Sequence, residues 1–241
     1  MTSILRRPSH RAWSLAGLGL ATALFAVPIC AAQVLRAGVS VELAVTSYAV
    51  PMPGADDQDS LVVAVTNDGN IYVEARRIVP GALADKLRSS LANQREGTFY
   101  IKADARTPYA GVATVLEAAR TAGIEAPILL TARRESEAGR RESLDGLEVF
   151  VTLPLPSGAE STVVQVIYSG QQSPTLTINN EQIAWAALPS TLGRIFQTRS
   201  EKAVLVKADG QSRFAHVVQA IDLCRSTGAK VILALPGVTV L

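Results

Sequence analysis

An internal repeat constrains the fold of this chain more than any other feature of its 241 residues. Residues 101–124 read IKADARTPYAGVATVLEAARTAGI, and residues 206–229 read VKADGQSRFAHVVQAIDLCRSTGA. The two stretches align without a gap at a spacing of 105 residues, so that residue 101 corresponds to residue 206. A fixed spacing of this kind indicates one supersecondary unit that is present more than once. We therefore expect a small α/β unit in two copies.

Each copy is predicted to run strand, hairpin, helix, strand, helix, strand. In the first copy, apolar periodicity predicts strands over 38–43, 61–66, 71–73, 98–103 and 127–131, and helices over 80–92 and 107–122. The second copy repeats this pattern with strands over 146–151, 163–168, 176–178, 204–208 and 231–235, and helices near 185–197 and between Ser212 and Gly228. The strand–helix–strand crossover makes strands 98–103 and 127–131 parallel.

Short local signals predict where turns and helix ends fall. The Asn67-Asp68-Gly69-Asn70 segment predicts a hairpin turn of type I′ in the first copy. Thr107 and Ser212 are predicted to cap the helices that follow them, with Pro108 opening the first of the two. Gly123 and Gly228 stand where a helix commonly ends in a left-handed residue.

The N-terminus carries a targeting segment, for which two interpretations stay open. Ala12 to Leu35 contains no charged residue and follows a basic flank that includes Arg6 and Arg11. This run is long enough to span a bilayer, and it also fits a secretory signal peptide cleaved before Gln33. Residues 1–36 are therefore predicted to be a transmembrane anchor or a signal peptide, with the rest of the chain outside the cytoplasm.

The predicted fold class is α/β, in a two-layer α+β arrangement behind the N-terminal apolar helix. Domain 1 is placed at 37–131 and domain 2 at 146–241, each with a mixed sheet and two helices. Residues 132–145 mix charges of both signs with almost no apolar side chains, which predicts a solvated linker. A charged helical extension is the alternative for this segment, and a docking patch is a further one.

Composition narrows the function classes. The formal net charge is +2 and aromatic residues make up 5% of the chain, so nothing indicates a nucleic-acid surface. The two cysteines, Cys30 and Cys224, lack metal-ligand spacing, and only Cys224 lies in a repeat. We expect no structural disulfide and interpret Cys224 as a small core residue.

The sequence of the first repeat resembles that of the periplasmic domain of the ExbD/TolR biopolymer-transport family. The resemblance is carried by LVVAVTNDGNIYVEARRI at 61–78, by FYIKADARTPYAGVATVLEAARTAGI at 99–124, and by the strand ILLT. The segment GLEVFVTLP at 146–154 also resembles the first strand of that family. The second repeat departs from the pattern, because it lacks Asp-Gly and has Arg213 in place of the helix-opening Pro108.

The resemblance implies an inner-membrane protein of proton-driven motors, with a periplasmic domain that dimerises and contacts partners or the cell wall. It also implies an aspartate in the transmembrane helix that takes part in proton translocation. Ala12 to Leu35 contains no Asp, Glu, Lys, Arg or His, so that residue has no counterpart here. We expect partner binding to persist without proton conduction by this chain.

The residues that recur between the repeats are the candidate site residues, and each has a structural explanation. Asp104 and Asp209 follow a strand, where loop hydrogen bonding is expected, and Lys102 and Lys207 are expected to be solvated strand ends. The other recurring pairs are interpreted as helix-terminal cations and as core positions: Arg120/Arg225 and Tyr109/Phe214. His216 has no nucleophile or base beside it in the sequence. We therefore assign no catalytic, cofactor or metal residue, and the partner-binding residues stay unknown.

The sequence thus predicts a non-enzymatic ExbD/TolR-like envelope protein at the bacterial inner membrane, facing the periplasm. Its predicted partners are envelope proteins, of ExbB/TolQ-like or TonB/TolA-like type, or the cell wall. The alternative is a secreted periplasmic interaction or peptidoglycan-binding module. A hydrolase on duplicated α/β units is disfavoured, because no nucleophile–base pair is present. Two routes to binding follow from the repeat: addition of a strand at a sheet edge, and pairing of the two units within one chain.

Overall fold

The computed structural model describes residues 39–57, 60–92, 98–133, 144–151, 161–170 and 173–235. Residues Ala37 to Leu241 form one compact unit. The predicted N-terminal helix within residues 1–36 lies outside the described residues, as do positions 134–143 of the predicted linker. Among the helices of the described residues, none combines the length and apolar character needed to cross a membrane.

The first repeat builds a large mixed sheet with two helices. Its elements are β1 (Val45–Thr46), β2 (Val50–Pro51), the 3-10 helix η1 (Pro53–Asp56), β3 (Leu61–Val65), β4 (Ile71–Val73), β5 (Arg76–Ile78), α1 (Pro80–Leu91), β6 (Phe99–Ala103), α2 (Tyr109–Thr121) and β7 (Ile128–Arg133). With β8 (Asp145–Glu148) included, the strand order is β2-β8-β7-β6-β3-β4-β5, and β1 also pairs with β7. β3, β6 and β7 are parallel, which confirms the predicted crossover.

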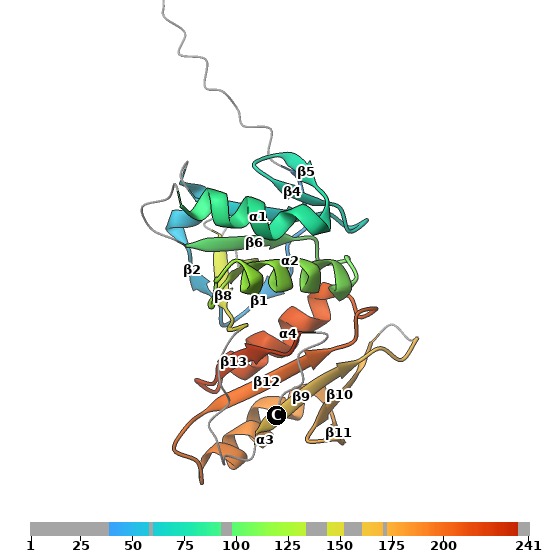
Figure 1. The fold of residues 1–241 in the computed structure, drawn as a ribbon. Coiled ribbons are helices and arrows are strands. Elements are labelled where there is room, and N and C mark those ends of the chain that lie inside the picture. Colours follow the sequence, from blue (N-terminus) through green and yellow to red (C-terminus); the bar gives the residue numbers. More distant parts are fainter. Residues whose placement is uncertain are drawn as a thin grey trace, which may run out of the picture. The chain divides into compact units, whose positions relative to one another are not determined.

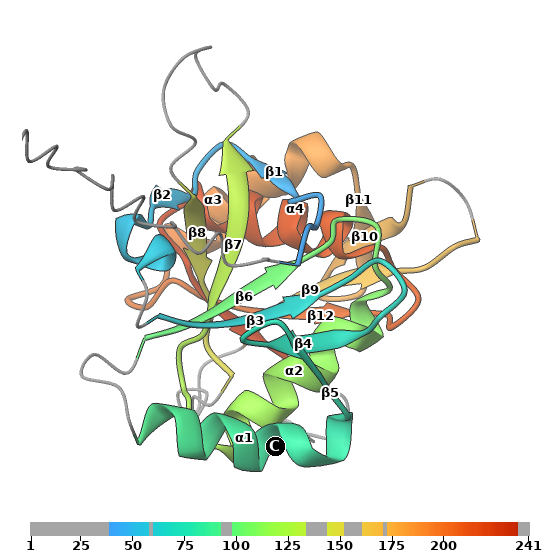
Figure 2. The same cartoon turned by 90° about the horizontal axis from the view of Figure 1, so that it is seen from above.

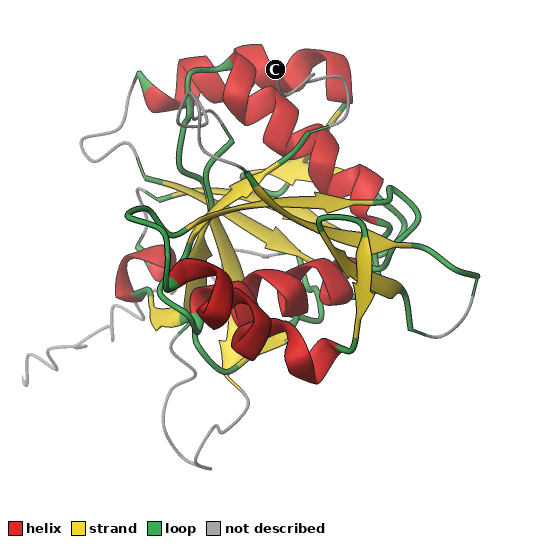
Figure 3. Ribbon diagram, turned by 90° about the horizontal axis from the view of Figure 1, so that it is seen from below, coloured by secondary structure: helices red, strands yellow, loops and turns green. Residues whose placement is uncertain are grey.

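The second repeat builds the same arrangement with fewer strands. Its elements are β8 (Asp145–Glu148), β9 (Thr162–Ile167), β10 (Thr175–Ile178), β11 (Glu181–Ile183), the 3-10 helix η2 (Trp185–Ala187), α3 (Leu188–Phe196), β12 (Ala203–Ala208), α4 (Phe214–Arg225) and β13 (Lys230–Leu233). The order β11-β10-β9-β12-β13 corresponds to β5-β4-β3-β6-β7 of the first repeat. Figure 1 shows α2 and α4 next to each other, and Figure 3 shows helices on two sides of the strands.

Apolar spacing explains why the helices lie where they do. In α1 a proline occupies the first turn, where its missing N–H is no loss, and Leu83 and Leu87 are fully buried one turn apart. In α3 the equivalent residues are Leu188 and Leu192, which are also fully buried. The predicted stripes of α2 and α4 are buried as well: Tyr109, Val112, Leu116, Ala119, Phe214, Val217, Val218, Ile221 and Cys224.

Two local predictions were wrong. No strand forms over 39–43, and the first strand is β1 at Val45–Thr46. The main chain at Glu42 is held by a loop instead, because its carbonyl accepts the Ala105 N–H at 2.7 Å. The turn at 67–70 is not of type I′, because Gly69 has a positive φ of 77° but Asp68 does not.

Each repeat has a hairpin with the φ pattern of a type I′ turn, at a place where none was predicted from the sequence. Glu74 and Ala75 both have positive φ, 51° and 64°, and they connect β4 to β5. Asn179 and Asn180, with φ of 49° and 72°, connect β10 to β11 in the second repeat. The second strand of each hairpin, β5 or β11, is an edge strand of its sheet.

β8 links the two sheets. The strand pairs with β7 through residues 128–131, and its continuation pairs with β13 through a parallel bridge between Phe150 and Ile232. The sequence placed the start of domain 2 at Gly146, and this residue lies within β8. Figure 2 shows β1 and β8 beside β7.

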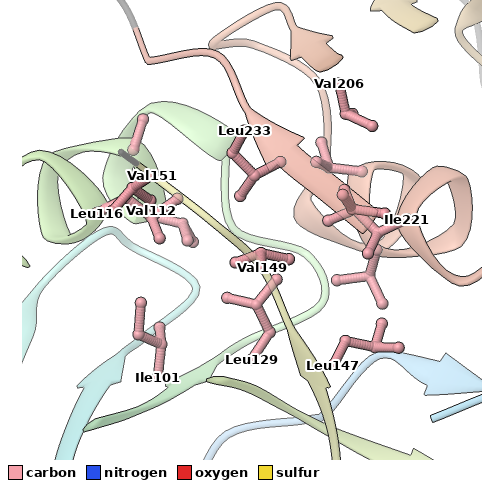
Figure 4. Close-up of a cluster of buried hydrophobic side chains, with 14 of the residues drawn as sticks. Ile101, Val112, Leu116, Leu129, Leu147, Val149, Val151, Val206, Ile221 and Leu233 are labelled. Atoms are coloured by element: carbon pink, nitrogen blue, oxygen red, sulfur yellow. The ribbon is translucent and has the colours of Figure 1, made fainter. Parts of the chain in front are cut away.

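The apolar cores of the two repeats are continuous. One cluster of buried side chains includes Leu116 and Leu129 from the first repeat and Val206 and Ile221 from the second. Figure 4 shows Leu147, Val149 and Val151 of the linking segment among these side chains. The region from 39 to 235 therefore packs around a shared interior rather than around two separate ones.

Candidate functional site

The two stretches that carry the internal repeat meet each other directly. The Tyr109 N–H donates to the Ser212 carbonyl at 2.8 Å, and the equivalent Phe214 N–H donates to the Thr107 carbonyl, also at 2.8 Å. Pro108 and Arg213 form an antiparallel bridge at the centre of this contact. Because each bond has a counterpart with the roles of the repeats exchanged, the contact is isologous, as in a two-fold symmetric dimer.

A second pair of hydrogen bonds extends the same contact, which we call the joint and define as residues 105–110 with 210–215. The Ala110 N–H donates to the Gly210 carbonyl at 3.0 Å, and the Ala215 N–H donates to the Ala105 carbonyl at 2.9 Å. The first N–H groups of a helix have no acceptor within the helix. In the joint, carbonyls of each repeat accept hydrogen bonds from the helix start of the other.

The joint explains why the predicted side-chain caps are absent. Neither α2 nor α4 has a side-chain cap hydrogen bond. The hydroxyls of Thr107 and Ser212 are buried, and neither has a hydrogen-bond partner among the described residues. The prediction that these residues cap their helices was therefore wrong, because main-chain carbonyls of the opposite repeat occupy that role.

A buried carboxylate adds a second tie between the repeats. Asp222 in α4 is 6% exposed, and its two oxygens accept the N–H groups of Ser47 and Tyr48, each at 2.9 Å. These two residues follow β1 directly, so the second repeat holds the segment that enters the first repeat's sheet. Glu117, the counterpart of Asp222 at a spacing of 105 residues, pairs with Arg120 instead.

Asp104 and Asp209 differ although they recur. Asp104 is 3% exposed, and it accepts hydrogen bonds from the Arg106 guanidinium, at 2.9 Å to each oxygen, and from the Glu42 N–H at 3.1 Å. The Arg106 side chain holds the pKa of the Asp104 carboxyl well below its usual range. Asp209 is exposed and accepts the Gln211 N–H at 3.0 Å. Both carboxylates thus bond to their own loop, and only Asp104 has a guanidinium partner.

The other recurring polar residues lie on the surface of the repeats. Lys102 is half-buried and Lys207 is exposed, at the ends of β6 and β12. Arg120 and Arg225 lie in the last turns of α2 and α4, where a cation faces the negative end of the helix dipole. Arg120 also pairs with Glu117. These positions bring no two recurring cations together in one site.

Histidine and cysteine side chains act in catalysis in many enzymes. Among the described residues, neither His216 nor Cys224 is paired with a nucleophile or a base. His216 is half-buried beside Trp185, with ring centroids 6.3 Å apart, and burial together with the charge of Arg213 lowers its pKa. Burial raises the pKa of the Cys224 thiol to about 12, so this group is protonated at neutral pH. Across the described ranges, no group of three or more His, Cys, Asp or Glu side chains is placed to hold a metal ion.

Edge strands are the features that can accept a partner. β5 ends the first sheet and β11 ends the second. At the opposite ends, the first sheet finishes with the two-residue strand β2 beside β8, and β13 of the second sheet carries the bridge to Phe150. An edge strand presents unpaired main-chain groups to which an extended segment can add. Beside β11 the surface is hollowed into a pocket of about 400 Å³ between the β10–β11 hairpin and α3.

Comparison with known protein families matches one part of the chain. Residues 25–134 match the family model described as biopolymer transport protein ExbD/TolR. No curated protein matches the chain. The matched segment spans a little under half of the chain and includes all of the first repeat's sheet up to β7. The first repeat, together with the residues just before it, is therefore similar to the ExbD/TolR biopolymer-transport family.

Proposed function

We propose that this chain is an envelope component of biopolymer transport that acts by binding partners in the periplasm. The family of the first repeat supports the association with biopolymer transport. Within the described residues, the joint supports the rest of the proposal, because it resembles a symmetric dimer contact made inside one chain. Residues 1–36 would hold the protein at the inner membrane, with both repeats on the periplasmic side.

The joint leaves the two outer edges available for partners. Its hydrogen bonds use the loops before α2 and α4, which lie away from β5 and β11 in each sheet. A covalent link between the two units keeps their effective concentration high, so that pairing does not depend on a second chain. A single copy of this protein would then present two equivalent edges at once.

Proton conduction is assigned to other subunits in this proposal. The run from Ala12 to Leu35 has no carboxylate, and a carboxylate is the group that carries protons across the bilayer in the family. The chain would therefore act beside a motor of ExbB/TolQ type, or would bind TonB/TolA-like partners, without supplying the proton-carrying residue.

The test is capture from envelope extract with the full-length chain as bait. Co-purification of an ExbB/TolQ-type stator subunit supports the proposal. Recovery of cell-wall fragments without any stator subunit overturns it in favour of a peptidoglycan-binding module. The mass of the mature chain tests the anchor separately, since loss of residues 1–32 would show that the protein is released into the periplasm.

A further inference from the structure

The pocket beside β11 differs from the equivalent surface of the first repeat. In the first repeat, Lys86 of α1 and Glu74 of the hairpin form an ion pair at 3.6 Å. Their counterparts at a spacing of 105 residues are Thr191 of α3 and Asn179 of the hairpin, and both line the pocket. Two long charged side chains that meet across the groove in one repeat are thus replaced by two short ones in the other.

The walls of the pocket combine apolar and charged groups. Ile178 and Ile183 come from the hairpin, and Ile195 comes from α3. Glu181 stands on the hairpin side and Arg194 on the helix side, and both side chains are exposed. Among the described residues, neither of the two has an ion-pair partner. A ligand that fits this surface needs an apolar group flanked by groups of both charge signs.

The open edge of β11 lies along one side of the pocket. Residues 178 and 181 pair directly across the two-residue turn, and residues 176 and 183 pair further along. In such a hairpin these pairs exchange the main-chain hydrogen bonds, so the N–H and C=O of Gln182 face away from β10. Glu181 and Ile183 then share the face toward α3, since alternate side chains lie on one face.

We propose that this groove binds an extended peptide segment of a partner protein, which adds to β11 as a further strand. On its face toward α3 the segment carries a basic side chain beside Glu181, an apolar side chain beside Ile183, and an acidic side chain near Arg194. Cross-strand pairs of opposite charge favour this register. The inference rests on the proposed partner-binding function and locates it in the second repeat.

The probe is a fluorescein-labelled peptide, TVTKTET, which places Val, Lys and Glu on one face of a strand. When it runs antiparallel to β11, Val lies beside Ile183, Lys beside Glu181, and Glu on the turn side of Glu181, toward Arg194. Its binding to the full-length protein in detergent is measured by fluorescence anisotropy. A peptide with proline in place of the threonine between Lys and Val lacks the N–H that would donate to Gln182. We expect this peptide to bind at least tenfold more weakly.

The decisive variant rebuilds the ion pair of the first repeat in the second, as Asn179→Glu with Thr191→Lys. Glutamate is compatible with this turn position, because Glu74 adopts a φ of 51° where Asn179 has 49°. We expect at least a tenfold loss of affinity for TVTKTET. The matched control, Ser190→Lys with Gln197→Glu, adds the same charges at exposed positions of the α3 segment outside the pocket and should bind like the wild type.

Charge exchange tests the register. The Arg194→Glu variant should bind TVTKTET more weakly than the wild type does. It should prefer TVTKTKT, in which the acidic side chain is replaced by a basic one. The proposal is overturned if no peptide binds at millimolar concentration, if the rebuilt ion pair leaves affinity unchanged, or if Arg194→Glu keeps the wild-type preference. If the rebuilt variant still captures the envelope partner, this inference fails while the proposed function stands.

Discussion

The recurring aspartates show how one residue type serves two different environments. Asp104 connects two parts of the chain, because its carboxylate accepts hydrogen bonds from the main chain and side chain of Arg106 in its own loop and from the Glu42 N–H. Asp209 has Gln211 where Asp104 has Arg106, and among the described residues its carboxylate accepts a hydrogen bond only from the Gln211 N–H. The sequence predicted loop hydrogen bonding at both positions, but recurrence could not reveal which copy was buried.

Asp104→Asn is expected to destabilise the protein by about 2 kcal/mol, because hydrogen bonds to a charged group contribute about 1.5–3 kcal/mol. Asp209→Asn, at the exposed equivalent, should change stability by less than about 0.5 kcal/mol. Urea unfolding followed by far-UV circular dichroism measures both variants. Equal effects of the two substitutions would contradict the set of hydrogen bonds that we describe at the Asp104 carboxylate.

The Asp104→Asn variant also allows a prediction of how stability depends on pH. The folded pKa of Asp104 lies below that of an unfolded aspartate, which is about 3.9. Its contribution to stability is therefore present in full above about pH 5 and is lost as the pH falls toward the lowered folded value. We expect the stability difference between wild type and Asp104→Asn to be constant from pH 5 to 7 and to shrink below pH 4, in urea titrations at each pH.

Cys224 provides a second test at the residue scale. The side chain is fully buried in α4 and its pKa is raised to about 12, so the reactive thiolate is scarce at neutral pH. In a Cys30→Ser background, Cys224 should not react with a thiol reagent such as DTNB in buffer and should react fully in urea. Rapid reaction of the folded protein would show that α4 is not packed as described.

Elements were predicted well where apolar periodicity defines them and poorly where contacts between repeats do. The stripe of α3 predicted a helix that the structure confirms, since Leu188, Leu192 and Phe196 are all buried. β5 was missed because Glu74-Ala75 carries no sequence signal for a type I′ turn. β11 was missed although Asn179-Asn180 is such a signal, since asparagine adopts positive φ more readily than most residues. Thr107 and Ser212 look like caps in sequence, but main-chain carbonyls of the other repeat are invisible at that level.

Glycines give a matched pair of predictions at the element scale. Gly193 lies in α3 with open space around its missing side chain, so Gly193→Ala should raise stability by about 0.5–1 kcal/mol. Gly228 ends α4 with a φ of 74°, and alanine there should lower stability by about 1–2 kcal/mol. Thermal or urea unfolding of both variants decides between these signs. If both substitutions stabilised the protein, the left-handed backbone conformation that we describe at Gly228 would be contradicted.

At the scale of the whole molecule, duplication produced a shared interior and a reciprocal contact. The repeat and its spacing were readable because each copy keeps its own strand, helix and terminal glycine. Their pairing was only a hypothesis from sequence, since no residue pattern states which surface of one copy meets the other. The role of β8 was harder still to predict from the sequence, because residues 145–151 resemble the opening strand of a separate unit. In the structure this segment pairs with β7 and then contacts β13.

A shared core predicts that the repeats unfold together. Leu116 of α2 is fully buried in the cluster that Figure 4 shows, and Leu116→Ala should lower the free energy of unfolding by about 2–5 kcal/mol. Trp185 reports on the second repeat, where its indole N–H donates to the Pro174 carbonyl at 3.1 Å. In a Trp13→Phe background, the unfolding midpoint seen by Trp185 fluorescence should fall with the midpoint seen by circular dichroism. An unchanged Trp185 midpoint would mean that the two repeats unfold independently, because damage in the first would not reach the second.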